Sequence, residues 1–142
     1  MTSQQLDEIW DGNTTNDKSI LAQKRILLAE DNILNQKVAA LILEGAGAEV
    51  VVANTGKEAV DILSEDRNFD AVLMDVQMLV MDGLTAVREI RETLRLRDLP
   101  IIALTANASK EDRERCLRIG MDAYSSKPFK PEQLFDVIQE AV

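Results

Sequence analysis

The chain has 142 residues, 46% of them hydrophobic and 29% charged, a composition typical of one folded domain rather than a disordered segment. One cysteine and no histidine exclude an internal disulfide, a cysteine-built zinc site, histidine metal ligation, and Ser-His-Asp or Cys-His catalysis. The net charge of −9 disfavours nucleic-acid binding, and no apolar run approaches the roughly 20 residues that span a bilayer.

The first 24 residues differ in composition from the rest of the chain. Residues 1–24 are rich in polar side chains and contain Asp11-Gly12-Asn13, a turn signal. They lack the basic and apolar regions of a signal peptide. We therefore predict a tail or linker over 1–24, a single domain over 25–142, and a cytoplasmic location. Trp10 and Leu21 are candidates for docking on the domain or on a partner.

Short apolar runs that predict β-strands recur from Arg25 onward. The first four are continuous rather than alternating, which is typical of strands covered on both faces, and the fifth is weaker. The runs are Ile26–Ala29, Glu49–Ala53, Ala71–Met74, Ile101–Leu104 and Ala123–Ser125.

The segments between these runs have the spacing of helices. In the first, Leu34, Val38, Leu41 and Ile42 fall at i, i+4, i+7 and i+8, and Gly45 and Gly47 follow as stop signals. The other predicted helices carry the stripes Ala59–Leu63 and Leu84–Leu94, or span Lys110–Ile119 and Pro131–Ala141. Strand and helix thus alternate five times, which predicts an α/β fold with a parallel sheet, right-handed crossovers and helices on both faces.

Polar side chains gather where these strands end. Glu30 and Asp31 follow the first strand, Asp75 follows the third, Thr105 the fourth, and Lys127 the fifth. Each alone is unremarkable, since an aspartate at a strand end is most often a helix cap or a turn former. Because ligands of open α/β sheets bind beyond the carboxyl ends of the strands, their collection at one edge indicates a site.

This set of residues favours phosphoryl chemistry on a carboxylate. Two like charges about 4 Å apart repel by roughly 1 kcal/mol in water and about 4 kcal/mol at an effective dielectric of 20. Three carboxylates therefore call for a hard cation, and we predict Mg²⁺. A carboxylate flanked by Mg²⁺ and Lys127 could attack a phosphoryl group, because both cations neutralise its oxygens. Thr105 could donate a hydrogen bond to one of those oxygens.

Five motifs, in this order, make the chain similar to the receiver domains of two-component response regulators, the CheY-like family. They are Leu28-Ala29-Glu30-Asp31-Asn32, Leu73-Met74-Asp75-Val76-Gln77-Met78, Met81-Asp82-Gly83, Ala103-Leu104-Thr105-Ala106 and Ser126-Lys127-Pro128-Phe129. The Glu-Asp-Asn and Lys-Pro-Phe forms most resemble receivers of hybrid sensor histidine kinases. The resemblance implies a doubly wound (βα)5 flavodoxin-like sandwich of three layers, with five parallel strands in the order 2-1-3-4-5.

The resemblance also implies a role for each residue of the acidic site. Asp75 matches the aspartate that takes a phosphoryl group from a phosphohistidine. Glu30 and Asp31 match the acidic pair that holds Mg²⁺ together with Asp75, and Gln77 matches the position that lends the metal its backbone carbonyl. Lys127 matches the lysine that pairs with the phosphoryl group.

Three further residues carry the implied switch and its support. Thr105 matches the hydroxyl that turns toward the new phosphoryl group, and Tyr124 matches the aromatic residue that moves with it. The peptide bond between Lys127 and Pro128 would be cis. The implied protein is a signalling switch that catalyses its own phosphorylation and dephosphorylation, rather than a metabolic enzyme.

The implied partners follow from the absence of histidine. The phosphohistidine must belong to a histidine kinase or a histidine phosphotransfer protein, in another chain or another domain. A downstream effector would bind the face formed by the fourth helix, the fifth strand and the fifth helix. We expect no direct nucleic-acid binding and no membrane insertion, and either a stand-alone receiver or one that belongs to a larger sensor kinase.

Alternative functions are weighed on single residues. A phosphohydrolase with an aspartate nucleophile usually has a second aspartate two residues later, where this chain has Gln77. A flavin-binding module needs a loop that cradles phosphate, which Glu30 and Asp31 would repel. A pseudo-receiver that binds partners without phosphorylation stays open as the alternative. Leu79 stands where the family usually has proline, so we expect a more mobile loop after Asp75.

Other side chains have plain structural explanations. Cys116 is expected to be a small buried hydrophobe, and Tyr124 could be a core residue. The arginines are expected to lie on solvated helix faces, paired with acids along the helix. They are Arg88, Arg91, Arg95, Arg113, Arg115 and Arg118.

Overall fold

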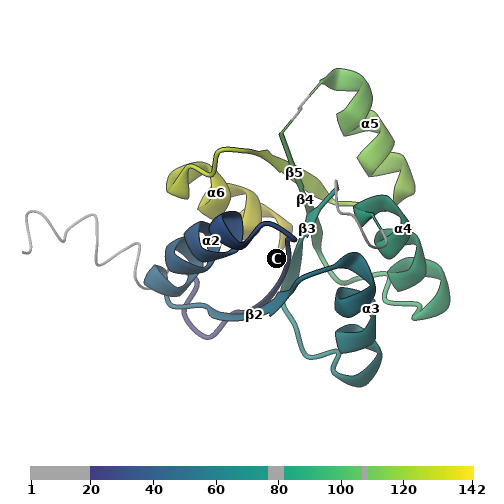
Figure 1. The fold of residues 1–142 in the computed structure, drawn as a ribbon, viewed down its shortest axis with the longest axis horizontal. Coiled ribbons are helices and arrows are strands. Elements are labelled where there is room, and N and C mark those ends of the chain that lie inside the picture. Colours follow the sequence, from purple (N-terminus) through teal and green to yellow (C-terminus); the bar gives the residue numbers. More distant parts are fainter. Residues whose placement is uncertain (1–19, 77–81, 107–108) are drawn as a thin grey trace, which may run out of the picture.

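The computed structural model describes residues 20–76, 82–106 and 109–142, and strands alternate with helices along them (Figure 1). The strands are β1 (Arg25–Ala29), β2 (Glu49–Ala53), β3 (Ala71–Asp75), β4 (Ile101–Thr105) and β5 (Ala123–Ser126). The helices are α2 (Ile33–Gly45), α3 (Gly56–Glu65), α4 (Gly83–Arg88) with the π-helical turn η1 (Glu89–Thr93), α5 (Lys110–Ile119) and α6 (Pro131–Ala141). The predicted strands and helices are confirmed, and the strand ends differ from the predicted ones by one residue at most.

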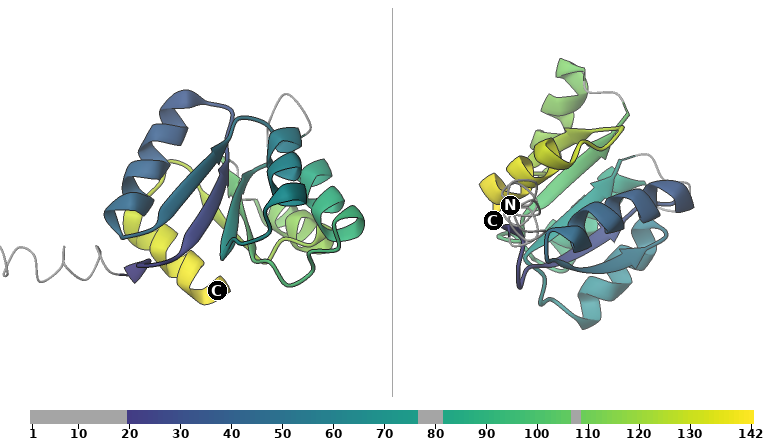
Figure 2. Two further views of the ribbon diagram at one scale, coloured as in Figure 1. Left: turned by 90° about the horizontal axis from the view of Figure 1, so that it is seen from below. Right: turned by 90° about the vertical axis from the view of Figure 1, so that its left-hand side faces the viewer.

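The strands form one parallel sheet in the order β2-β1-β3-β4-β5, as the family resemblance implied. Helices α2 and α6 cover one face of the sheet, and α3, α4 and α5 cover the other (Figures 1 and 2). All residues of β3 and β4 are buried, whereas the edge strand β2 is half-exposed over most of its length. The continuous apolar runs therefore mark strands covered on both faces in the middle of the sheet, but not at its edge, where β2 has a neighbour on one side alone among the described strands.

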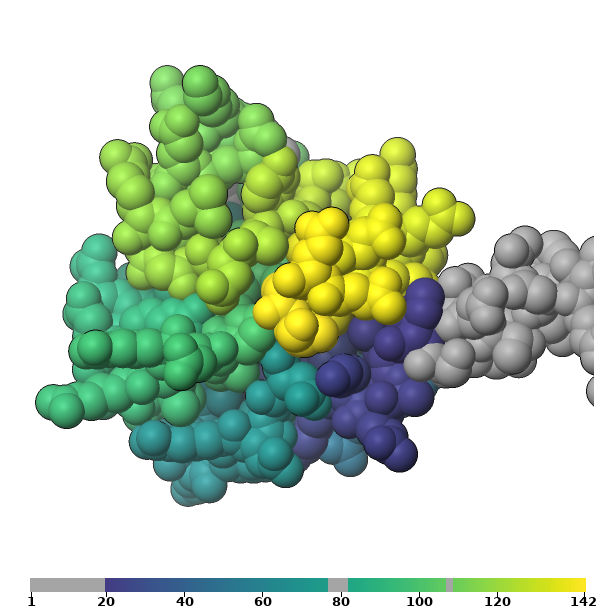
Figure 3. All heavy atoms as spheres, turned by 180° about the vertical axis from the view of Figure 1, so that it is seen from behind, coloured from purple at the N-terminus to yellow at the C-terminus, as the bar shows by residue number. Residues whose placement is uncertain are grey.

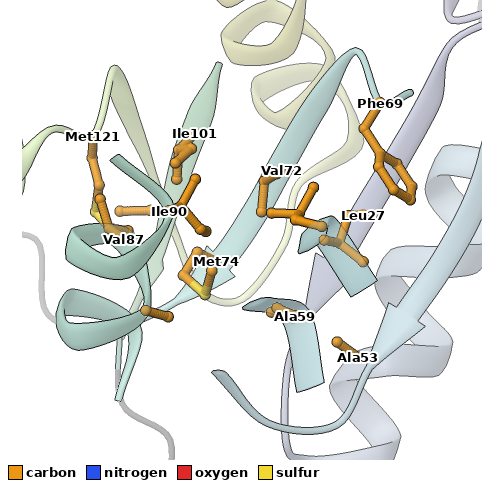
Figure 4. Packing of buried hydrophobic residues seen from close by; sticks show 14 of the residues in the cluster. Leu27, Ala53, Ala59, Phe69, Val72, Met74, Val87, Ile90, Ile101 and Met121 are labelled. Carbon is orange, nitrogen blue, oxygen red and sulfur yellow. The ribbon is translucent and has the colours of Figure 1, made fainter. Parts of the chain in front are cut away.

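Alternate residues of the central strands enter two separate cores, because successive side chains of a strand point to opposite faces. Leu27 and Val72 pack with Ile90 on the side of α3, α4 and α5 (Figure 4). Leu28 and Leu73 belong to the core beneath α2 and α6. The sheet is thus held from both sides, and its strand ends present side chains at a rigid edge.

Helix α2 turns most of its predicted apolar stripe toward solvent, whereas Ile42 of that stripe packs against the core. Leu34 and Leu41 are 69% and 72% exposed, whereas Ala39 and Leu43 are buried against the sheet. The periodicity correctly indicated a helix. It did not indicate the buried face, because the sheet accepts a small alanine and one leucine there instead of the larger stripe.

Leu21, which the sequence left as a docking candidate, packs on the domain itself. Its side chain is fully buried with the core under α2 and α6, and its amide donates to the carbonyl of Ala46 at 2.9 Å. Figure 3 shows this first described segment, in purple, beside the yellow α6. The division of the chain at residue 25 stays a prediction, and Trp10 lies outside the described residues.

Arg91 corrects the prediction of solvated arginines. Its side chain in the ion pair with Asp122 is only 11% exposed, and the two groups are 2.8 Å apart. The guanidinium also donates to the carbonyls of Leu96, Leu99 and Gly120 at 2.6 to 3.0 Å. A planar group with five donors can satisfy several loop carbonyls at once. Arg91 therefore joins η1 to the loop between α5 and β5.

Over the described ranges, no helix has the length and apolar character needed to cross a bilayer.

Candidate functional site

The three predicted carboxylates meet at one edge of the sheet. Glu30 and Asp31 follow β1 and Asp75 ends β3, and these two strands are neighbours. One oxygen from each carboxylate lies within 4.8 Å of the other two. Glu30 is fully buried and Asp75 is 3% exposed, while Asp31 is half-buried. The site is therefore a dense, largely water-excluded group of negative charges with one open side.

Lys127 enters this group from the end of β5. Its Nζ lies 2.6 Å from Oε1 of Glu30 and 3.2 Å from Oδ2 of Asp75. Burial by itself would lower the pKa of the ammonium, but the hydrogen bonds and charges of Glu30 and Asp75 outweigh it, so the pKa of Lys127 is raised. The lysine therefore stays charged at neutral pH.

The backbone around Lys127 holds it in place. Its amide donates to the carbonyl of Thr105 at 2.9 Å, which ties the end of β5 to the end of β4. The Lys127–Pro128 peptide bond is cis, the conformation that the resemblance implied.

Glu30 is fixed by contacts at its backbone and its carboxylate. Its amide donates to Ala53 O at 3.1 Å, and its carbonyl accepts from Nε2 of Gln36 at 2.5 Å. Its Oε2 accepts from the amide of Asn32 at 3.1 Å. Asn32 also caps α2 by accepting from the amide of Asn35. The start of α2 thus orients the glutamate before any ligand arrives.

Gly83 determines how closely α4 approaches Asp75. A Cβ atom at this position would lie 2.3 Å from the carbonyl oxygen of Asp75 and 2.7 Å from Cα of Val76. No side chain fits without moving the end of β3. Gly83 belongs to the motif Met81-Asp82-Gly83, but its role could not be predicted from the sequence. The glycine alone does not indicate which backbone segment approaches it.

The site fits a divalent cation. Three carboxylates face the single ammonium of Lys127, so negative charge is in excess and every ligand atom offered is an oxygen. Such a donor set suits a hard ion such as Mg²⁺. Gln77, the predicted carbonyl ligand, and Leu79 both lie outside the described residues.

Thr105 and Tyr124 meet at a cavity beside the acidic group. Thr105 is 5% exposed at the end of β4. The cavity has a volume of about 110 Å³, and both residues line it together with Val76, Leu84 and Cys116. Cys116 is buried, as expected of a small hydrophobe, and burial raises the pKa of its thiol.

Residues 26–139 match the family model described as the response regulator receiver domain. The chain belongs to this family. It is 41% identical over 141 residues to probable histidine kinase 3 of rice, Oryza sativa subsp. japonica, with 84% of this chain covered. The chain covers only 14% of that kinase.

Two solved receiver structures extend the comparison. The receiver domain of sensor histidine kinase PA1611 from Pseudomonas aeruginosa is 45% identical, with a TM-score of 0.76 over 84% of this chain and 97% of the other. That structure has a magnesium ion coordinated in its active site cleft. The receiver domain of Ssk1 from Saccharomyces cerevisiae, crystallised with the histidine phosphotransfer protein Ypd1, is 28% identical, with a TM-score of 0.77 over 84% and 89%.

Proposed function

We propose that this receiver domain accepts a phosphoryl group from a phosphohistidine onto the carboxylate of Asp75. The carrying observation is the placement of Asp75, buried 3.2 Å from the Lys127 ammonium and beside two further carboxylates. A carboxylate oxygen of Asp75 would attack phosphorus as the bond to the histidine nitrogen breaks, which leaves an acyl phosphate and a free imidazole.

The cation belongs to this proposal. Glu30, Asp31 and Asp75 would hold Mg²⁺, with the carbonyl of Gln77 as a further ligand, and the ion would neutralise charge on the phosphoryl oxygens. The Mg²⁺ in the cleft of the PA1611 receiver supports this choice. Lys127 would pair with a phosphoryl oxygen, and the hydroxyl of Thr105 would donate to another.

The donor would dock over the exposed side of α2. The chain has no histidine, so the phosphohistidine must come from a kinase or phosphotransfer domain. Ile33, Leu34 and Leu41 are 65%, 69% and 72% exposed on a helix that begins two residues after Asp31. An apolar surface continuous with the site suits a partner that must bring its histidine to Asp75. The Ypd1–Ssk1 complex supports a phosphotransfer protein as the occupant.

This docking surface can be tested apart from the chemistry. We expect Leu34→Gln to slow phosphoryl transfer from phosphorylated Ypd1 at least about fivefold, because a central apolar contact is lost. Phosphorylation by acetyl phosphate should be unchanged, because that small donor needs no docking surface. Leu117→Gln on α5, where Leu117 is 51% exposed, is the matched control and should leave both rates unchanged.

The effector would bind the groove between α5, β5 and α6. The groove has a volume of about 560 Å³, and its lining includes Leu117 and Val137 beside Asp136 and Glu140. This mixture favours a partner segment that carries apolar and basic side chains. A cytoplasmic location stays a prediction from the sequence.

The deciding experiment is incubation with acetyl phosphate and Mg²⁺, followed by intact-mass measurement. We expect a single added phosphoryl group that is absent in Asp75→Ala and absent without Mg²⁺. Asp61→Ala, on exposed α3 and paired only along that helix with Lys57, is the matched control and should be phosphorylated normally.

A missing adduct has two explanations that a second measurement separates. Rapid self-hydrolysis would hide the adduct, but beryllofluoride with Mg²⁺ would then still shift the NMR signals around Thr105 and Tyr124. Silence in both experiments would contradict the proposal and leave a pseudo-receiver that binds partners without phosphorylation.

A further inference from the structure

Arg113 on α5 contacts the side chain of Tyr124 on β5 in two ways. Its Nη1 donates to the Tyr124 hydroxyl at 2.5 Å, and its guanidinium carbon lies 5.1 Å from the centre of the tyrosine ring. Both side chains are half-buried. From the sequence, we expect Arg113 on a solvated helix face. The structure corrects this assignment, because the arginine is engaged by a hydrogen bond and a cation–π contact with a neighbouring strand.

Tyr124 lines both an inner cavity and an outer groove. On one side it lines the cavity of about 110 Å³ that also contacts Thr105 and Arg113. On the other side it lines the groove of about 560 Å³ between α5, β5 and α6. A movement of the tyrosine would therefore change the inner cavity and the outer groove together.

In this arrangement the Nε atom of Arg113 is left without a hydrogen bond to the described residues. Its Nε is buried and has no hydrogen-bond partner among the residues that the structure describes. A buried N–H without an acceptor is unfavourable, so this arrangement gains contacts to Tyr124 and loses solvation at Nε. Opposing contributions of this kind suit an equilibrium between two positions rather than a permanent structural link.

The same helix is closely connected to Thr105. Only residues 106–109 separate the end of β4 from the start of α5, and Arg113 lies in the first turns of that helix, where its amide donates to Ser109 O. A displacement of Thr105 toward a ligand on Asp75 would change the cavity that Thr105 lines together with Arg113 and Tyr124.

We propose that Arg113 is a positioning residue that holds Tyr124 in the observed conformation and so opposes the switch driven from Asp75. The proposal rests on the proposed function, since it concerns regulation of that same site. A contact formed in only one of two states biases the equilibrium toward that state, and by linkage weakens any ligand that prefers the other. The phosphoryl group must therefore overcome the Arg113–Tyr124 contact.

Beryllofluoride binding in the presence of Mg²⁺ tests the proposal on the full chain. Tyr124 is the one tyrosine in the sequence, so ring-labelled ¹³C-tyrosine reports on it through a single set of NMR signals. Arg113→Met keeps the length of the side chain and removes its donors and charge. We expect its apparent beryllofluoride affinity to rise roughly two- to tenfold, the equivalent of one hydrogen bond.

Two further variants separate positioning from general destabilisation. Arg118→Met removes an exposed arginine of the same helix and should leave the affinity unchanged. In a Tyr124→Phe background, which lacks the hydroxyl acceptor, Arg113→Met should lose most of its effect. An unchanged affinity in Arg113→Met, or an equal rise in both backgrounds, would overturn the proposal.

Failure of the proposal is distinguishable from failure of the proposed function. If the unmodified protein neither forms the acetyl phosphate adduct nor responds to beryllofluoride, the proposed function fails. The tyrosine signal without beryllofluoride then tests Arg113 alone. A ring signal in Arg113→Met that moves away from its position in the parent protein would support the proposal, whereas a signal that stays there would show that the arginine does not position Tyr124.

Discussion

Two cationic side chains face groups of carboxylates at opposite ends of the strands of the same sheet. Lys127 lies beyond the ends of β1 and β3 with Glu30 and Asp75, as described above. Arg25 opens β1, where its Nε lies 2.6 Å from Glu49 and its Nη1 lies 2.5 Å from Asp66. Each cation is therefore outnumbered by acids, but the two groups differ in pairing and in exposure.

At Arg25 each acid has a donor of its own. Besides the two side-chain pairs, Asp70 accepts from the backbone amide of Arg25 at 2.7 Å, and the guanidinium stacks 4.3 Å from the centre of the Phe69 ring. The side chains of Glu49 and Asp66 are 68% and 41% exposed, so water screens their charges. This group needs no additional cation and fastens the start of the sheet.

At Lys127 the acids share one ammonium and converge. Their oxygens approach within 4.8 Å of one another, and among the described residues this is the group whose carboxylates could jointly hold a metal. Burial strengthens the repulsion between them. The comparison shows that a ligand site depends on convergence and burial of charges, and not on the number of acids around a cation.

Removal of the two cations should separate the groups most clearly. Without Mg²⁺, we expect Lys127→Met to lower the free energy of unfolding by on the order of 3 kcal/mol, because Glu30 and Asp75 remain buried without their cation. Mg²⁺ should restore more stability to this variant than to the parent protein. Urea unfolding with and without Mg²⁺ measures both effects.

Arg25→Met is the matched variant at the other edge. We expect it to lose less stability than Lys127→Met, because its partners are exposed, and to respond to Mg²⁺ as the parent protein does. An equal Mg²⁺ response in the two variants would remove the distinction between the groups.

Gly83→Ala tests whether convergence depends on the close approach of α4. Its Cβ would clash with the backbone at Asp75, and overpacking of this kind costs roughly 1–3 kcal/mol. Phosphorylation by acetyl phosphate should slow about tenfold or more, because the carboxylate is displaced. Gly45→Ala, with open space around the added methyl, is the control and should be neutral or slightly stabilising. Normal phosphorylation of Gly83→Ala would contradict the positioning role.

The pH dependence of stability should distinguish the groups by a smaller effect. The hydrogen bond from Arg25 and that from the Asn68 backbone lower the pKa of Asp66. Its contribution is therefore present above the ordinary carboxyl pKa and is lost as the pH falls through the lowered value. The difference between the parent protein and Arg25→Met should shrink only below about pH 4.

The stability contribution of Lys127 should have the opposite pH dependence. Because its folded pKa is raised, its contribution is complete below the ordinary lysine pKa and is lost as the pH rises through the folded value. The difference between the parent protein and Lys127→Met should therefore hold to about pH 10 and shrink above it. Urea midpoints over a pH series would contradict this if the difference fell between pH 7 and pH 9.

Much of the fold and of the acidic site could be predicted because the relevant signals are local. Strand runs and helix periods are read within a few residues, and a parallel sheet brings its strand ends to one edge. Glu30, Asp75 and Lys127 could therefore be grouped before their contacts were known. The exposure of the apolar stripe of α2 could not be predicted. The spacing of apolar residues identifies an amphipathic helix, but it does not show which surface covers its apolar side.

The sequence by itself determined the alternation of elements, the strand order through its family resemblance, and the gathering of the acidic residues and Lys127 at the strand ends. Only the tertiary structure showed that Arg91 reaches Gly120 and Asp122, which lie 29 and 31 residues away along the chain, and that Arg113 reaches Tyr124, 11 residues away. It also showed why Gly83 is needed beside Asp75. Contacts between distant segments depend on how helices pack on the sheet, and that packing is set by the shapes of many side chains together.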